Sequence, residues 1–248
     1  MLDYPTLDDI KSALFVQPHP DDNEIGAGGT MAYLVQKGIP VYSVSVTKGD
    51  GGSDEHSPEA LASIRALEAQ HASDILGVTY LGDLGYTNTN PGTISSICED
   101  IVNIMRTHHI QTLISVDPDL DNECHPVHLT VGRAVNEAFV RCPQRYYPFH
   151  EHRIHDDAYH PEILGHYFTK HDNTIVGIDA VYTQKMDAIR AHSSQVNEAF
   201  LQQLNTLYQA YAIGTPYTYA ERLKLLYPIH THCFAIRDEL LESLMESL

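Results

Sequence analysis

The chain has 248 residues, of which 43% are apolar, and its 15 basic and 33 acidic residues give a formal net charge of −18. This apolar content excludes a disordered chain, and the length suffices for the core of one α/β domain. The negative charge disfavours nucleic acid and anionic membranes as partners, and no apolar run approaches the roughly 20 residues that a membrane span needs.

The first part of the chain alternates short apolar runs with segments of helical apolar spacing. The runs predict strands over 12–17, 41–47, 78–81 and 112–116. The helical segments cover about 26–37, 58–76 and 94–107, and a further helix begins near 128. This alternation indicates right-handed βαβ units and a Rossmann-like α/β fold, with helices on both faces of a parallel sheet.

The last third of the chain is less regular. The segment 142–172 is rich in Pro, His and Tyr and is predicted to be irregular, before a strand over 174–178 and helices over 183–191 and 196–211. No repeat or linker interrupts the chain, so we expect 1–248 to form a single domain whose elaborated C-terminal third, from about 142, lines the pocket. Residues 237–245 have helical spacing and are expected to pack on the same domain or on a neighbouring subunit.

The cysteines and the N-terminus indicate a cytoplasmic protein. The four cysteines are widely spaced and form no Cys-x-x-Cys motif; they are Cys98, Cys124, Cys142 and Cys233. This usage favours reduced thiols over a disulfide framework. The first four residues lack the basic and apolar regions of a signal peptide.

Polar clusters follow each of the four predicted strands. His19 follows the first, Asp50 the second and Asp83 the third, and the segment 117–128 follows the fourth. In an open parallel sheet, ligands bind beyond the carboxyl ends of the strands, so we expect these clusters to share one rim.

Two of these clusters together predict a metal-dependent hydrolase. His19 and Asp22 lie in one turn, and His128 follows the fourth strand, so the three side chains suffice for a zinc ion with an open position. Asp21 is then the natural general base, and His125 could stabilise an oxyanion. Taken alone, Pro-Asp-Asp is most often a turn and His-x-x-His a surface pair.

These residues belong to longer motifs that resemble the LmbE/PIG-L family. The matching segments are residues 18–30 (PHPDDNEIGAGGT), 47–52 (TKGDGG) and 125–128 (HPVH), with Arg65, Glu68, Ala72, Leu76, Gly77, Lys185, Ala188, His192, Ser194 and Gln195. The resemblance implies a zinc-dependent deacetylase of N-acetylglucosamine-containing small molecules, which forms trimers or hexamers. Ferrous iron is the alternative metal that the same ligands accept.

The resemblance also implies a role for each matching residue. The implied metal ligands are His19, Asp22 and His128, the base is Asp21, the oxyanion-stabilising histidine is His125, and the substrate-binding residues are Arg65, Asp83 and His230. Two of the substrate-binding residues have an alternative interpretation. Arg65 could form a surface ion pair with Glu68, and Asp83 could be a turn residue after the third strand. His230 matches a C-terminal segment of the chitobiose-deacetylase branch, and His192 receives no role.

One residue departs from the family pattern. The second motif usually reads His-Pro-Asp-His, and Val127 stands where the aspartate belongs. That aspartate normally pairs with the first histidine and raises its pKa. Unless an acidic residue of the segment 117–123 substitutes, we expect His125 to be protonated less often near neutral pH and the basic limb of the pH–rate profile to lie lower.

Other functions are compatible with parts of this pattern. Gly26, Gly28 and Gly29 suggest a dinucleotide site, but Met31 occupies the sixth position of G-x-G-x-x-G, so close packing of the turn and helix explains the glycines better. A zinc amidase acting on a thiol conjugate would keep the same metal site. A non-catalytic sugar- or nucleotide-binding module would use the histidines structurally.

Overall fold

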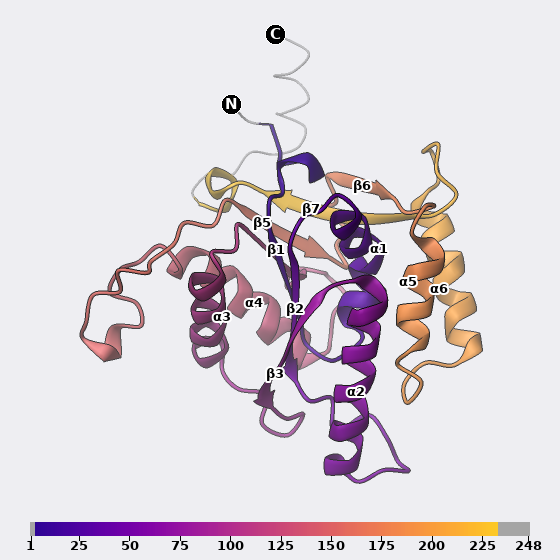
Figure 1. Ribbon diagram of the computed structural model, residues 1–248, viewed down its shortest axis with the longest axis horizontal. Coiled ribbons are helices and arrows are strands. Elements are labelled where there is room, and N and C mark those ends of the chain that lie inside the picture. The colour runs from indigo at the N-terminus through magenta and orange to yellow at the C-terminus, as the bar shows by residue number, and fades with distance from the viewer. Residues whose placement is uncertain (1–2, 233–248) are drawn as a thin grey trace.

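The computed structural model describes residues 3–232, which form a seven-stranded sheet with helices on both faces (Figure 1). The strands run in the order β3-β2-β1-β4-β5-β7-β6. Their bounds are β1 Ala13–Gln17, β2 Val41–Thr47, β3 Thr79–Tyr86, β4 Thr112–Val116, β5 Ile163–Tyr167, β6 Thr174–Gly177 and β7 Ala220–Leu226. Strands β1 to β5 are parallel to one another, whereas β7 is antiparallel to both of its neighbours. The predicted Rossmann-like parallel sheet is confirmed.

Between residues 3 and 232, six α-helices pack around the sheet. Their bounds are α1 Asp22–Gln36, α2 Pro58–Leu76, α3 Ile94–His108, α4 Pro126–Arg141, α5 Tyr182–Arg190 and α6 Glu198–Tyr211. One apolar core joins the sheet to α1, α2 and α5, and a second joins the opposite face to α3 and α4. Figure 1 shows these two helical layers on either side of the strands. Helix α2 begins and ends as predicted, with Ser57 accepting a hydrogen bond at the N-cap and Gly77 at φ 74°.

The predicted irregular segment 142–172 contains a central strand, so that prediction was wrong. All five residues of β5 are buried, and the strand pairs with β4 along its length. Most of the Pro, His and Tyr residues lie in the irregular segment that precedes β5. Because they dominate the composition of 142–172, the short apolar run of β5 was not recognised as a strand. Strand β7 was also missed, because its charged residues interrupt the apolar pattern. The stretch 237–245, predicted to be helical, lies outside the described residues.

The glycines at the start of α1 allow close packing, as the sequence indicates. A Cβ atom on Gly26 would lie 2.1 Å from the ring of Tyr167, and one on Gly29 would lie 2.6 Å from Ile178. These positions therefore require glycine because β5 and the segment after β6 approach the helix closely.

A buried ion pair fixes α1 to the C-terminal third of the chain. Lys185 Nζ lies 2.5 Å from Glu221 Oε1, and both side chains are at most 1% exposed. Glu221 also accepts hydrogen bonds from the backbone N–H groups of Gly29 and Thr30, at 2.7 Å each. Lys185 donates to the Ile25 carbonyl at 2.8 Å. The pair therefore holds α5, β7 and the helix that begins at the turn after β1.

Replacing the lysine should destabilise the protein strongly. We expect Lys185→Met to lower the free energy of unfolding by about 3–5 kcal/mol, because it leaves the Glu221 carboxylate buried without its cation. Urea unfolding followed by circular dichroism measures the change. Arg190→Met is the matched control, because Arg190 lies on the same helix and pairs with Asp187 while 51% exposed. Equal losses in the two variants would contradict the prediction.

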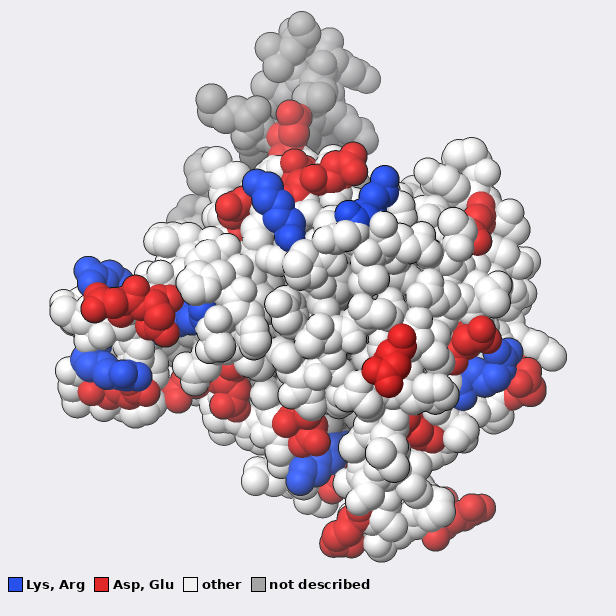
Figure 2. Space-filling view, viewed as in Figure 1, with Lys and Arg blue, Asp and Glu red and all other residues white. Residues whose placement is uncertain are grey.

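Charged side chains of both signs lie on the face of the molecule shown in Figure 2. On the described part of the face shown in Figure 2, acidic side chains are scattered and the basic ones mostly lie beside them. None of the helices described is long and apolar enough to cross a membrane.

Candidate metal centre and active site

The turn after β1 presents the first functional residues. It begins at Pro18, and α1 begins at Asp22, four residues earlier than predicted. The Gln17 side chain, buried at the end of β1, organises this turn: its Oε1 accepts from the N–H of Asn23 at 2.8 Å and from that of Asp21 at 3.3 Å. Its Nε2 donates to Ser45 on β2 at 3.0 Å. Gln17 was not predicted to take part in the site; the signal that could have revealed it is a polar side chain at the end of an apolar buried strand.

Three side chains meet at the carboxyl ends of β1 and β4. Asp22 Oδ2 lies 3.3 Å from His19 Nδ1 and 3.4 Å from His128 Nε2, and one ligand atom from each residue lies within 4.8 Å of the others. Tetrahedral zinc with ligands at 2.0–2.1 Å separates its ligand atoms by about 3.3 Å. The two imidazoles and the carboxylate therefore fit a divalent metal ion in both donor type and spacing.

The charges in this cluster are strongly coupled. Although burial works to raise it, hydrogen bonds from His128 and His19 hold the pKa of Asp22 well below its usual range. Burial works to lower the pKa of His128, but the hydrogen bond to Asp22 and the charges of Asp22 and Glu123 raise it to about 9. Near neutral pH, Asp22 is therefore ionised, whereas His128 must give up a proton when it binds a cation.

Asp21 lies beside the ligand set in an unusual backbone conformation. Its φ of 123° is rare for a residue other than glycine, and the Gln17 side chain and Arg65 hold it there. Arg65 Nη2 lies 3.2 Å from Asp21 Oδ2, and the same guanidinium donates to the carbonyls of Pro20 and Gly49. Burial, followed by the charge of Asp22, raises the pKa of Asp21 to about 7, while Arg65 opposes the shift. A carboxyl group of this kind can exchange a proton near neutral pH.

His125 completes a group of three imidazoles. It is the N-cap residue of α4, so the helix begins just after it, and its ring centroid lies 4.7 Å from that of His19 and 4.9 Å from that of His128. Burial, followed by the nearby His19 and His128 charges, lowers its pKa. Val127 is only 5% exposed and packs in the core between the sheet, α3 and α4. The lowered pKa of His125 thus arises from burial and the two neighbouring imidazoles, and the effect of Val127 on it stays a prediction.

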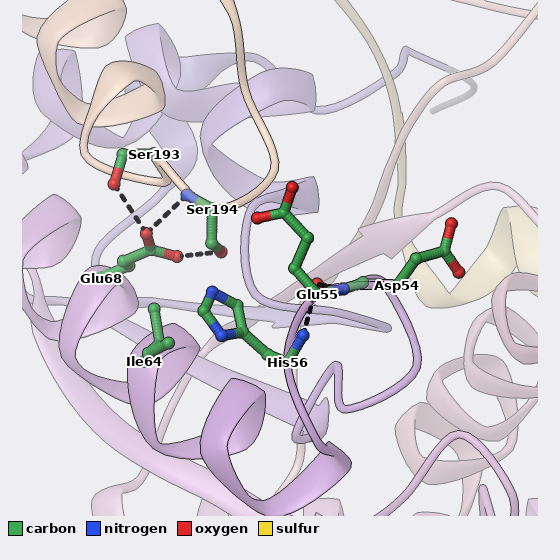
Figure 3. Close-up of a pocket in the computed structure, with 8 residues that line it drawn as sticks. Asp54, Glu55, His56, Ile64, Glu68, Ser193 and Ser194 are labelled. Atoms are coloured by element: carbon green, nitrogen blue, oxygen red, sulfur yellow. Dashed lines mark hydrogen bonds between the residues drawn. The ribbon is translucent and has the colours of Figure 1, made fainter.

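Arg65 is buried, so the alternative of a surface ion pair with Glu68 was wrong. Its side chain is 5% exposed and is directed at Asp21 and the neighbouring carbonyls. Glu68 instead accepts hydrogen bonds from Ser193 and Ser194, beyond the end of α5 (Figure 3). These residues line an open pocket of about 580 Å³ beside the loop after β2. The C-terminal third therefore contributes to this pocket, whereas contact between Arg65 and a sugar hydroxyl stays a prediction.

Asp83 does not follow the third strand as predicted. Strand β3 continues to Tyr86, and Asp83 lies within it, opposite Ser45 of β2. Its exposed carboxylate accepts a hydrogen bond from the N–H of Gly85 at 2.9 Å. Glycines at two positions of the strand hid its true length, and Asp83 is not among the residues that the metal cluster brings together.

His230 lies at the opposite end of the sheet from the metal cluster. Because β7 runs antiparallel to β5, with Leu226 opposite Leu164, the chain leaves β7 at the amino ends of the parallel strands. There the ring of His230 packs against that of Tyr4, with ring centroids 4.7 Å apart and the planes tilted by 39°. Within one chain, the structure therefore does not bring His230 to the metal cluster, and contact of His230 with substrate stays a prediction. The pattern alone did not reveal the direction of β7.

His192, which the sequence left without a role, lies next to the turn. It is fully buried at the end of α5, and its Nε2 lies 3.4 Å from Oε2 of the equally buried Glu24. Like the Lys185–Glu221 pair, the contact between His192 and Glu24 joins the end of α5 to the first part of α1. A histidine and a glutamate distant in sequence carry no local signal of such a contact.

The fold and the site together define a class of protein. A mostly parallel α/β sheet that presents a His–Asp–His cluster, a neighbouring carboxylate held by an arginine and a further imidazole at its carboxyl rim has the features of a metal-dependent hydrolase. Comparisons with known proteins specify which one. Residues 14–139 match the sequence model of the PIG-L family, described as GlcNAc-PI de-N-acetylase.

Relatives match most of the chain. Diacetylchitobiose deacetylase of Thermococcus kodakarensis is 31% identical over 90% of this chain and 86% of its own length. A probable N-acetyl-alpha-D-glucosaminyl L-malate deacetylase 2 of Bacillus cereus is 28% identical over 77% of this chain and 86% of its own. The structure of N,N'-diacetylchitobiose deacetylase from Pyrococcus horikoshii superposes with a TM-score of 0.88 at 26% identity, covering 96% of this chain and 92% of that one. The chain belongs to the PIG-L family and is an N-deacetylase.

Proposed function

We propose that this deacetylase is zinc-dependent and removes the acetyl group from an N-acetylglucosamine-containing small molecule, releasing acetate and a free amine. The observation that carries the proposal is the pairing of two carboxylates with separate surroundings. Asp22 faces the imidazoles of His19 and His128, whereas Asp21 faces Arg65. One carboxylate is thus available to a metal and the adjacent one to a proton.

The names of the relatives support the choice of substrate class. The relatives from Thermococcus and Bacillus are named for acetylated glucosamine compounds that differ in the group attached to the sugar. The shared part is the acetamido sugar, so we expect specificity for that part to reside near the metal cluster. Assembly into trimers or hexamers stays a prediction.

Each residue of the site would have a separate role in the reaction. Zinc held by His19, Asp22 and His128 would supply a Lewis acid for the amide carbonyl and lower the pKa of a water molecule. Asp21 would take the proton from the attacking water and deliver it to the leaving nitrogen, as its pKa near neutrality allows. Arg65 would keep that carboxylate oriented. Protonated His125 would donate a hydrogen bond to the oxyanion that develops on the former carbonyl oxygen.

The test is acetate release from a panel of acetamido sugars. N-acetylglucosamine, diacetylchitobiose and a simple N-acetylglucosaminide would each be incubated with the protein, with and without a chelator. We expect chelator-sensitive release of acetate from at least one, with an equal amount of free amine. A zinc-loaded protein that releases none from the panel would contradict the assigned substrate class and favour a different conjugate. A protein that retains no metal would favour a binding module.

Val127 should set the pH range of the reaction. If His125 acts while protonated, its lowered pKa removes the donor at a lower pH, so the basic limb of kcat/KM lies low. We expect Val127→Asp to move that limb upward by about one pH unit, because a nearby carboxylate stabilises the imidazolium. Val127→Asn is the control for a polar group at this buried position. Identical basic limbs in the two variants would contradict this role of His125.

A further inference from the structure

One carboxylate of the loop after β4 contacts both histidines of the second motif. Glu123 Oε2 lies 2.9 Å from His128 Nδ1, and Glu123 Oε1 accepts a hydrogen bond from the backbone N–H of His125 at 2.7 Å. The loop itself is braced at this point, because the N–H of Glu123 donates to the Leu120 carbonyl at 2.9 Å. The side chains of Glu123 and His128 are 18% and 15% exposed, so water competes little for the contact.

The contact has a direct consequence for the imidazole of His128. A carboxylate accepts but does not donate, so Nδ1 must carry the proton. When the ring is neutral, Nε2 is then left as a lone pair, and Nε2 is the atom that faces Asp22 Oδ2 at 3.4 Å. The carboxylate therefore selects the tautomer and the ring orientation that a metal at this cluster requires.

The position of this carboxylate is linked to the departure at Val127. The family pattern places an aspartate between the two histidines, whereas here that position is apolar and packs into the core. The acidic side chain that faces the motif comes instead from before it. The Glu123 carboxylate contacts the ring of His128, whereas at His125 it contacts the backbone N–H and not the ring.

We infer that Glu123 is a positioning residue that holds His128 ready for the metal and thereby strengthens metal binding in this chain. The inference rests on the proposed function for the identity of the metal as zinc. It assigns Glu123 no contact with substrate. Outer carboxylates on metal-binding histidines typically contribute 10–100-fold in metal affinity or activity.

The experiment measures zinc affinity by competition with a chromophoric chelator at fixed pH. We expect Glu123→Ala to weaken zinc binding by about 10–100-fold. Asp121→Asn, in the same loop, is the matched control, because Asp121 is exposed and contacts only the exposed Lys170 among the described residues; we expect less than about twofold. Glu123→Gln, which keeps an oxygen acceptor, should recover part of the loss.

Two further readouts separate positioning from a general structural effect. The zinc-free variants should unfold at the same temperature as the zinc-free parent protein. In the zinc-loaded protein, the proton on His128 Nδ1 should give a slowly exchanging ¹⁵N-resolved signal that disappears in Glu123→Ala. Zinc affinity that falls no further in Glu123→Ala than in Asp121→Asn would overturn the inference. If Glu123→Ala fails to fold, Glu123→Met, which keeps the bulk of the side chain but has no oxygen acceptor, takes its place. Unchanged zinc affinity and an unchanged His128 signal in that variant would overturn the inference equally.

Acetate release by the same preparations distinguishes this inference from the proposed function. Wild-type protein that binds zinc through Glu123-supported His128 but releases no acetate from any acetamido sugar contradicts the function and leaves the inference standing. Acetate release with zinc affinity indifferent to Glu123 contradicts the inference alone.

Discussion

Asp21→Asn is expected to lower turnover by about 10²–10⁴-fold while the protein keeps its zinc. The amide cannot take a proton from water, so the general base is lost, whereas His19, Asp22 and His128 are unchanged. Asparagine is preferred to alanine because it tolerates positive φ, and Asp21 sits at 123°. Initial rates of acetate release, measured alongside zinc content by atomic emission, give the two quantities.

A matched control tests whether the loss of any carboxylate, and not of Asp21 in particular, lowers turnover. Asp74→Asn changes an exposed carboxylate of α2 that pairs with Gln70 and is distant in sequence from the turn. We expect its turnover to match that of the wild type. Full activity in Asp21→Asn would remove Asp21 from the reaction. Loss of zinc in that variant would instead make Asp21 part of the metal site.

Asp22→Asn should have a different signature, because it removes a ligand. We expect zinc affinity to fall on the order of 10³-fold and turnover to fall with it, because one of the three ligands loses its charge. The variant keeps the shape of the side chain but not the charge that draws His19 and His128 together. Excess zinc should restore part of the activity, which it cannot do for Asp21→Asn.

Competition titration with a chromophoric chelator measures the affinity of Asp22→Asn, and activity is followed across increasing zinc. The Asp21→Asn protein is the matched partner, since it changes the adjacent carboxylate in the same turn. A normal zinc affinity in Asp22→Asn would contradict the assignment of the ligand set, whatever its turnover.

The parts of the site that were predictable lie in short, continuous motifs. His19 and Asp22 share a turn, and His128 follows a buried strand, so the rule for parallel sheets brought them to one rim and the structure places them within 4.8 Å of one another. The order of β1 to β4 followed from the alternation of apolar runs and helical spacing. These features are local, which is why the sequence pattern reveals them.

The parts that were missed depend on contacts between distant segments. The direction of β7 decides that His230 lies beside Tyr4, and its pairing with β5 and β6 fixes that direction. Arg65 turns inward to Asp21 because the turn after β1 and the loop after β2 each offer a carbonyl, which the helix sequence does not reveal. Glu123 was one of several acidic residues that could have faced the second motif, and the pattern did not distinguish them or show that the partner would be His128.

Metal reconstitution tests the central claim most directly. The protein would be stripped with a chelator, titrated with zinc and assayed at each step for acetate released from the best substrate of the panel. We expect activity to be absent in the stripped protein, to rise in proportion to added zinc and to stop rising at one zinc per chain. Acetate release that persists in metal-free protein would contradict the assignment of His19, Asp22 and His128 as the centre of the reaction.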